Sequence, residues 1–227
     1  LDDSAASALG LRGIRLSLLH RDELETQFRA ILRAAAHGPV RILLPMVSAV
    51  SEVHQARDVL MRAAKKLRRR KVKIPAELPP LGVMIEVPGA ALAADSLARI
   101  SDFFAIGSND LTMYTLAIDR ANEHVAHLFD PLHPGVLRLI QFSTAAAQRA
   151  GIPVSICGEI AGDPRYTALL TGLGLRELSM TPSSILKVKQ RIIGMDARAA
   201  TQRAQLIMDQ TDAGRIATLL DDFNALA

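Results

Sequence analysis

Two short apolar runs, each reaching a carboxylate, constrain the fold of this 227-residue chain more than any other feature. The first spans Gly82–Pro88 and contains Glu86, and the second spans Phe104–Asp110 and ends at Asp110. Such runs are typical of parallel strands that are buried on both faces. In α/β barrels the functional residues lie at the carboxyl ends of these strands. Two acids placed in this way, with Asn109 beside one, suit a hard cation such as Mg2+, although a single acid there is also a common cap of the next helix.

The chain alternates apolar runs with amphipathic segments, and no low-complexity linker interrupts it. This order predicts an α/β fold with a parallel sheet and helices outside it. The predicted strands are Ile14–Leu18, Arg41–Met46, Gly82–Val87, Phe103–Gly107, Val154–Cys157 and Glu177–Met180. The predicted helices include two with apolar stripes, at Leu24–Leu32 and Val53–Leu67, one opened by Pro88, and the segments Pro134–Ala150, Pro182–Ile193, Ala197–Met208 and Ala213–Ala225.

Composition narrows the class of protein. Hydrophobic residues make up 49% of the chain, enough for one large core, and no apolar run approaches the roughly 20 residues of a membrane helix. The single cysteine rules out an internal disulfide and fits a reducing cytoplasm. The net charge of +4 is small, and the basic cluster Lys65–Lys71 carries no aromatic residues for base stacking. We therefore expect a cytoplasmic protein without nucleic-acid or membrane partners, and a solvated helix end at this cluster.

Five motifs follow one another along the chain: Gly10–Arg15, Met84–Pro88, Gly107–Thr112, Ala117–Arg120 and Cys157–Asp163. In this order they resemble the C-terminal, phosphoenolpyruvate-binding domain of Enzyme I, the phosphoenolpyruvate–protein phosphotransferase of the bacterial sugar phosphotransferase system. The resemblance implies a (β/α)8 TIM-barrel fold. About six of the eight strands would be present, because two strands precede the first motif in that family. We expect residues 1–195 to form this incomplete barrel and residues 196–227 to form helices that pack on it.

The resemblance also assigns site residues. It implies that Glu86 and Asp110 hold Mg2+, and that Arg12, Asn109, Asp110 and Arg120 bind the substrate. Cys157 matches the residue that protonates C3 of the enolate to give pyruvate. Without the resemblance, a lone cysteine is more commonly a small buried residue, and an arginine a surface ion-pair partner.

In the resembled family the phosphoryl group of phosphoenolpyruvate passes to a histidine in an N-terminal domain and then to the carrier protein HPr. None of the six histidines of this chain lies in that acceptor motif. We therefore expect this stretch alone to be inactive in phosphotransfer, to bind phosphoenolpyruvate weakly and to form a homodimer. Two alternatives remain open: the corresponding domain of pyruvate phosphate dikinase or phosphoenolpyruvate synthase, and a non-catalytic module that senses phosphoenolpyruvate and dimerises. The sugar-transport and nitrogen-regulatory branches of Enzyme I are not distinguished.

Overall fold

The computed structural model describes residues 8–225. Five parallel strands form one sheet in the order β1-β2-β3-β4-β5, so each strand pairs with the next along the chain. The strands are β1 (Ile42–Leu44), β2 (Leu81–Ile85), β3 (Phe104–Gly107), β4 (Val154–Cys157) and β5 (Glu177–Leu178). Within the described residues β1 and β5 each have one neighbour, so the sheet is open. An open, wholly parallel sheet with α-helical connections is the architecture of an incomplete (β/α) barrel.

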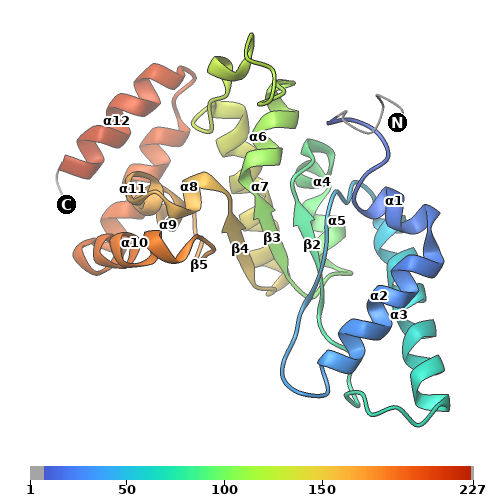
Figure 1. The fold of residues 1–227 in the computed structure, drawn as a ribbon. Coiled ribbons are helices and arrows are strands. Elements are labelled where there is room, and N and C mark those ends of the chain that lie inside the picture. The colour runs from blue at the N-terminus through green and yellow to red at the C-terminus, as the bar shows by residue number, and fades with distance from the viewer. Residues whose placement is uncertain (1–7, 226–227) are drawn as a thin grey trace.

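Helices connect the strands and cover the sheet. The helices before and between the strands are α1 (Ile14–Leu19), α2 (Arg21–Ala34), α3 (Val50–Arg69), α4 (Pro88–Leu92), α5 (Ala94–Ala98), α6 (Ser108–Leu116), the 3-10 turn η2 (Ala126–Leu128), α7 (Pro134–Ala150), α8 (Glu159–Gly162) and α9 (Pro164–Gly172). After β5 come α10 (Pro182–Gly194), α11 (Ala197–Met208) and α12 (Ala213–Ala225). Figure 1 shows α1, α2 and α3 on one side of the sheet and α10, α11 and α12 on the other.

Helix starts follow the local signals of the sequence. Pro88 and Pro134 occupy the first turns of α4 and α7, where a missing backbone N–H costs nothing. Gly151 ends α7 in the left-handed conformation, with φ of 70°. The side chain of Asp163 accepts a hydrogen bond from the N–H of Arg165 and so caps α9. These boundaries agree with the predicted ones.

One predicted strand, Ile14–Leu18, is wrong: this segment is helix α1. Apolar residues at 14, 16 and 18 have the spacing of a strand, but Ile14 and Leu18 are also one helical turn apart. Those two side chains contribute to the core, whereas Leu16 is exposed. The described part of the chain therefore has five strands and not the six expected.

Two apolar clusters hold these elements together. The larger one joins the sheet to the helices that flank it and includes Phe104 and Ile106 of β3, which are fully buried. The smaller one lies between α9, α11 and α12 and includes Leu169, Ile207 and Phe223. No helix among residues 8–225 is both long and apolar enough to cross a membrane.

Candidate functional site

The sheet register brings the predicted residues to one edge. Ile85, the last residue of β2, pairs with Ile106 of β3, and Gly107 pairs with Cys157 at the end of β4. Glu86 directly follows Ile85, so Glu86, Gly107 and Cys157 lie in one row across three strands. This row is the carboxyl edge of the sheet, where parallel α/β folds place their functional groups.

Glu86 is a buried carboxylate, only 3% exposed. The backbone N–H of Met46 donates to its Oε1 at 2.7 Å. Its Oε2 lies against the Cα of Gly107, since a Cβ built there would be 2.8 Å from that oxygen. The pKa of Glu86 is raised from 4.5 to about 7, mainly because burial disfavours the charged form. The Met46 hydrogen bond opposes the shift and the neighbouring Asp110 adds to it.

Asp110 lies beside Glu86 but not at a strand end as predicted. Strand β3 ends at Gly107, and Asp110 belongs to the first turn of α6. Its carboxylate lies close enough to that of Glu86 to help raise the pKa of Glu86. An acid in the first turn of a helix is favoured by the helix dipole, which explains how two acids are kept together here.

Arg12 supplies positive charge to the same place. Its charge opposes the rise in the pKa of Glu86, which places the guanidinium near the acid pair. Its Nη1 donates to the carbonyl oxygen of Ala8 and to the hydroxyl of Tyr114, both at 3.3 Å. Tyr114 was not singled out by the sequence. It follows Asp110 by four residues on α6, a spacing that puts both on one helix face and could have indicated it.

Asn109 and Arg120 are joined through Glu159. The N–H of Glu159 donates to Oδ1 of Asn109 at 3.1 Å, and the Glu159 carboxylate forms an ion pair with Arg120. The Arg120 guanidinium also lies over the ring of Phe129, 4.7 Å from its centroid. The structure thus places Arg120 at the rim of the site, held by a carboxylate that sequence reasoning had left without a role.

Cys157 is half-buried at the end of β4. Burial raises the pKa of its thiol, and the charges of Glu86 and Asp110 raise it too, so the sulfur is protonated at neutral pH. The hydroxyl of Ser108 donates to the Cys157 carbonyl at 2.7 Å and ties α6 to β4. The residue after it, Gly158, has φ of 97°, a conformation that side chains rarely adopt.

A hollow of about 550 Å3 opens beside this row. Asn109, Cys157 and Glu159 line it together with hydroxyls from the start of α10 and the segment before it, among them Thr181 and Ser184. The hollow is large enough for a small anionic metabolite, and it borders the thiol directly.

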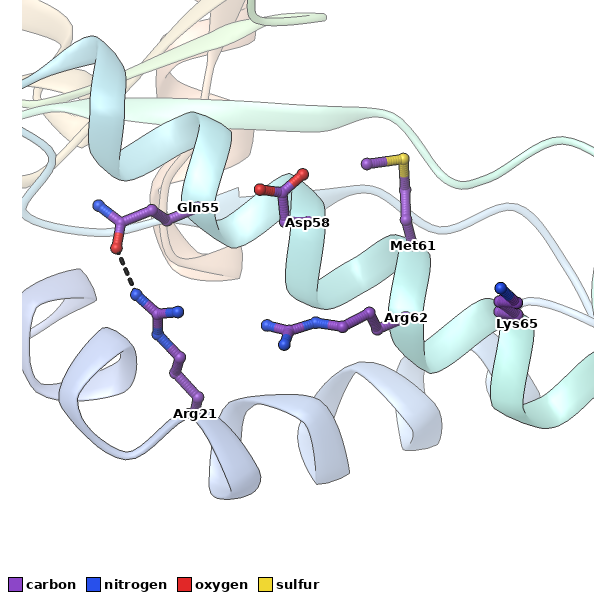
Figure 2. Close-up of a pocket in the computed structure, with 6 residues that line it drawn as sticks. All are labelled: Arg21, Gln55, Asp58, Met61, Arg62 and Lys65. Carbon is purple, nitrogen blue, oxygen red and sulfur yellow. Dashed lines mark hydrogen bonds between the residues drawn. The ribbon is translucent and has the colours of Figure 1, made fainter.

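Another hollow, of about 410 Å3, lies between α2 and α3 (Figure 2). Arg21 donates to Gln55 there at 2.6 Å, and Asp58 and Arg62 face the same space. None of the predicted site residues borders this hollow, and it is not at the carboxyl edge of the sheet. We therefore locate the candidate site at the Glu86–Asp110 pair.

The donor set at this pair fits Mg2+. Among the described residues no group of three or more His, Cys, Asp or Glu side chains could enclose a metal ion. Mg2+ does not need such a cage, because it is commonly bound by one or two carboxylates together with waters and substrate oxygens. The raised pKa of Glu86 reflects burial beside a second acid, and a dication between the two would relieve that repulsion.

The sequence of this chain is similar to that of a known protein family. The sequence model of the family described as "PEP-utilising enzyme, PEP-binding domain" matches residues 2–197. A phosphoenolpyruvate-protein phosphotransferase of Cupriavidus necator is 49% identical over 203 residues, covering 89% of this chain and 34% of that protein. Proteins of the same name from Listeria monocytogenes and Haemophilus influenzae are each 40% identical, covering 96% and 95% of this chain.

The chain spans between 34% and 38% of the length of these relatives. Among solved structures, a citrate lyase from Burkholderia xenovorans LB400 superposes with a TM-score of 0.57 at 21% identity, covering 89% of this chain and 68% of that one. This likeness concerns the fold alone. The family match extends over most of the chain, and the chain therefore belongs to the family of PEP-binding domains of PEP-utilising enzymes.

Proposed function

We propose that this chain is the phosphoenolpyruvate-binding domain of a phosphoenolpyruvate–protein phosphotransferase and binds its substrate with Mg2+ at the carboxyl edge of the sheet. The observation that carries the proposal is the convergence of three groups at one edge of the sheet: Glu86 after β2, Asp110 in the first turn of α6 and a protonated Cys157 at the end of β4. The names of the three relatives support the phosphotransferase branch over the dikinase or synthase branch.

In this proposal Glu86 and Asp110 hold the metal ion. Bound Mg2+ would neutralise charge on the phosphate and carboxylate of phosphoenolpyruvate. Arg12 and Arg120 bind phosphate oxygens, because a planar guanidinium can donate two parallel hydrogen bonds to them. Asn109 donates through its side-chain amide, since its Oδ1 already accepts from the N–H of Glu159. These contacts orient the substrate, on which phosphoryl transfer largely depends.

Cys157 acts as the general acid. When the phosphoryl group passes to the acceptor nitrogen, a P–N bond forms and the P–O bond to the enol oxygen breaks. The electron pair of that bond stays on the oxygen, which gives the enolate of pyruvate. The S–H bond of Cys157 then breaks, its proton forms the third C–H bond at C3, and the thiolate regains a proton from water. The raised pKa of the thiol keeps this proton available at neutral pH.

In the parent enzyme that we propose, the acceptor is a histidine outside residues 1–227 and the phosphoryl group continues to HPr in the cytoplasm. Residues 1–195 would form the substrate-binding part. Residues 196–227 would form a helical layer that packs on α9 through the smaller apolar cluster. We also propose that the parent enzyme is a homodimer that acts in a phosphotransferase system, of either the sugar-transport or the nitrogen-regulatory branch.

Titration calorimetry with phosphoenolpyruvate, with and without Mg2+, tests the binding proposal. We expect Mg2+-dependent binding that is weakened at least tenfold in Glu86→Gln and in Asp110→Asn, because each variant removes a charged metal ligand. Glu177→Gln is the matched control, since Glu177 is an exposed acid at the start of β5 that pairs with Arg41. Binding that is unaffected by Mg2+ and by both substitutions would contradict the proposal.

Proton exchange tests the role of Cys157 without an acceptor protein. In D2O with Mg2+, an acid–base group at C3 should exchange the methyl protons of pyruvate, which proton NMR detects. We expect Cys157→Ala to slow this exchange by about a hundredfold or more, while phosphoenolpyruvate binding is retained. Equal exchange rates in the wild type and the variant would show that the thiol only packs.

A further inference from the structure

Tyr114 is a polar residue beside the acid pair that the proposed mechanism does not use. It lies on α6, one helical turn after Asp110, and is half-buried. Its hydroxyl donates to the carbonyl oxygen of Ala8 and accepts from Nη1 of Arg12 at 3.3 Å. A phenol hydroxyl can make both kinds of bond at once. The tyrosine therefore links α6, the segment that precedes α1, and the guanidinium of Arg12.

These bonds use one corner of the Arg12 guanidinium and leave the rest available. Ala8 O and the Tyr114 hydroxyl are hydrogen-bonded to each other and both lie 3.3 Å from Nη1, so they share one N–H of this nitrogen. Among residues 8–225, neither Nε nor Nη2 of Arg12 makes a hydrogen bond. The Nε and Nη2 hydrogens form the parallel pair that fits two oxygens of a phosphate. The same arrangement directs this pair away from the protein contacts that hold Nη1.

Holding the guanidinium has an energetic consequence. A free arginine side chain loses rotamer entropy when it is fixed by a ligand. A side chain that is fixed before the ligand arrives loses less, so the ligand binds more tightly. The segment around Arg12 is itself confined: Gly13 has φ of 56°, and a Cβ there would be 2.6 Å from Cβ of Met46. The hydrogen bond to Tyr114 restricts the guanidinium of Arg12 in addition to its backbone.

We propose that Tyr114 is a positioning residue: its hydroxyl holds Nη1 of Arg12 so that Nε and Nη2 present a preformed bidentate site for the phosphate of the substrate. The inference rests on the proposed function, because it needs a phosphate at the site. It concerns a residue that touches neither the metal nor the substrate and acts only through Arg12.

Tyr114→Phe tests this, because it removes the hydroxyl and keeps the ring. Calorimetry with phosphoenolpyruvate and Mg2+ should show binding weakened by about tenfold, the lower end of the effect of one lost hydrogen bond to a charged group. The affinity for Mg2+ alone should not change, since the carboxylates are untouched. Tyr166→Phe is the matched control: it is the other tyrosine of the chain, is half-buried, and lies on α9.

A double-mutant cycle separates positioning from simple packing. In an Arg12→Ala background the Tyr114→Phe change should cause no further loss of affinity, because the group that it positions is gone. An equal loss in both backgrounds, or wild-type affinity in Tyr114→Phe, would overturn the inference. Loss of Mg2+ binding in Tyr114→Phe would also overturn it, by showing a general disturbance of the site. If the wild-type chain does not bind phosphoenolpyruvate, the proposed function fails and the inference with it, which is a different result from the others.

Discussion

At the scale of single residues, Gly107 decides where the carboxylate of Glu86 lies. The register places Gly107 beside the end of β2, and its missing side chain leaves the space that Oε2 of Glu86 occupies. Any other residue would put a Cβ 2.8 Å from this oxygen. Glycine often lets a ligand approach the backbone closely, because it has no side chain. At Gly107 it is the carboxylate of Glu86, which we propose binds the metal, that approaches closely.

Gly107→Ala should therefore displace the Glu86 carboxylate without removing it. We expect the affinity for Mg2+ to fall by about tenfold to a hundredfold, as for other changes that misplace a metal ligand. Calorimetry or competition with a fluorescent metal indicator measures the change. Gly89→Ala is the control, because Gly89 lies three residues after Glu86 and a Cβ there meets nothing within 4 Å. Equal Mg2+ affinity in both variants would contradict this account.

The raised pKa of Glu86 predicts how the stability of the metal-free protein depends on pH. The folded carboxyl titrates at about 7 and the unfolded one near 4.5, so the folded state binds the proton more tightly. The contribution of Glu86 to the free energy of unfolding should thus be greatest below pH 4.5 and should fall as the pH rises to 7. The full loss is on the order of 3 kcal/mol.

Thermal unfolding in the presence of a chelator checks this. We expect the difference in unfolding midpoint between Glu86→Gln and the wild type to grow in favour of the variant from pH 5 to pH 7.5. Added Mg2+ should restore the wild type at the higher pH, because the cation favours the charged carboxylate. A difference that stays constant over this range would argue that Glu86 has an ordinary pKa.

At the scale of elements, the sequence predicts the buried strands well and the peripheral segment poorly. β3 and β4 are short apolar runs in the middle of the sheet, and all four residues of β3 are buried. The observed bounds of β4 are those predicted. The strand prediction for Ile14–Leu18 is wrong because only one side of this segment meets the core. Apolar residues at positions 14 and 18 are then compatible both with the alternation of a strand and with one turn of a helix.

The site was predictable where it depends on strand ends and not where it depends on side-chain reach. The carboxyl ends of parallel strands meet at one edge, so the proximity of Glu86 and Cys157 follows from the pattern. The Arg120–Glu159 pair joins segments 39 residues apart and depends on the path of an irregular loop. The contact of Tyr114 with Arg12 spans 102 residues and requires the rotation of α6 about its axis. The sequence carries no local signal for either contact, although the four-residue spacing from Asp110 does indicate that Tyr114 shares its helix face.

Helix α11 packs very closely on α9 at Gly172. A Cβ at this position would overlap the carbonyl oxygen of Ala200 and lie 2.7 Å from Cβ of Ala204. Gly172→Ala should therefore push the two helices apart and destabilise the chain by about 1–3 kcal/mol, the usual cost of overpacking. Urea unfolding measures this cost, and hydrogen exchange should show faster exchange in α11 and α12 than in the sheet.

Gly194→Ala is the control for this change, because Gly194 ends α10 and a Cβ there meets nothing within 4 Å. Mg2+ binding should be the same in both variants, since the strands that carry the site belong to the larger apolar cluster and Gly172 contacts residues of the smaller one. A uniform rise in exchange across sheet and helices would show that the C-terminal helices are not a separate layer.

At the scale of the whole molecule, the two edge strands of the open sheet present surfaces that favour association with another chain. Within the described residues β1 and β5 pair on one side only, and unpaired strand edges favour association. Exposed apolar side chains lie on the helices at both ends of the sheet: Leu16 and Leu19 on α1, and Leu186 and Ile193 on α10, with Leu186 76% exposed and Ile193 75% exposed. Burying such surface against a second copy is favourable by roughly 25 cal/mol per Å2.

We therefore expect this chain to associate with itself at micromolar concentration, with a closed symmetric dimer as the simplest product. Sedimentation velocity measures the association. Paired substitutions by lysine, either at Leu16 and Leu19 or at Leu186 and Ile193, should shift the chain toward monomer in at least one case, because a charge in an apolar contact is costly. Leu92→Lys is the control: Leu92 is 70% exposed but lies on α4, which packs against the interior strand β2. A monomeric wild type would contradict this expectation. An association that resists both pairs of substitutions would show that these apolar side chains lie outside the contact.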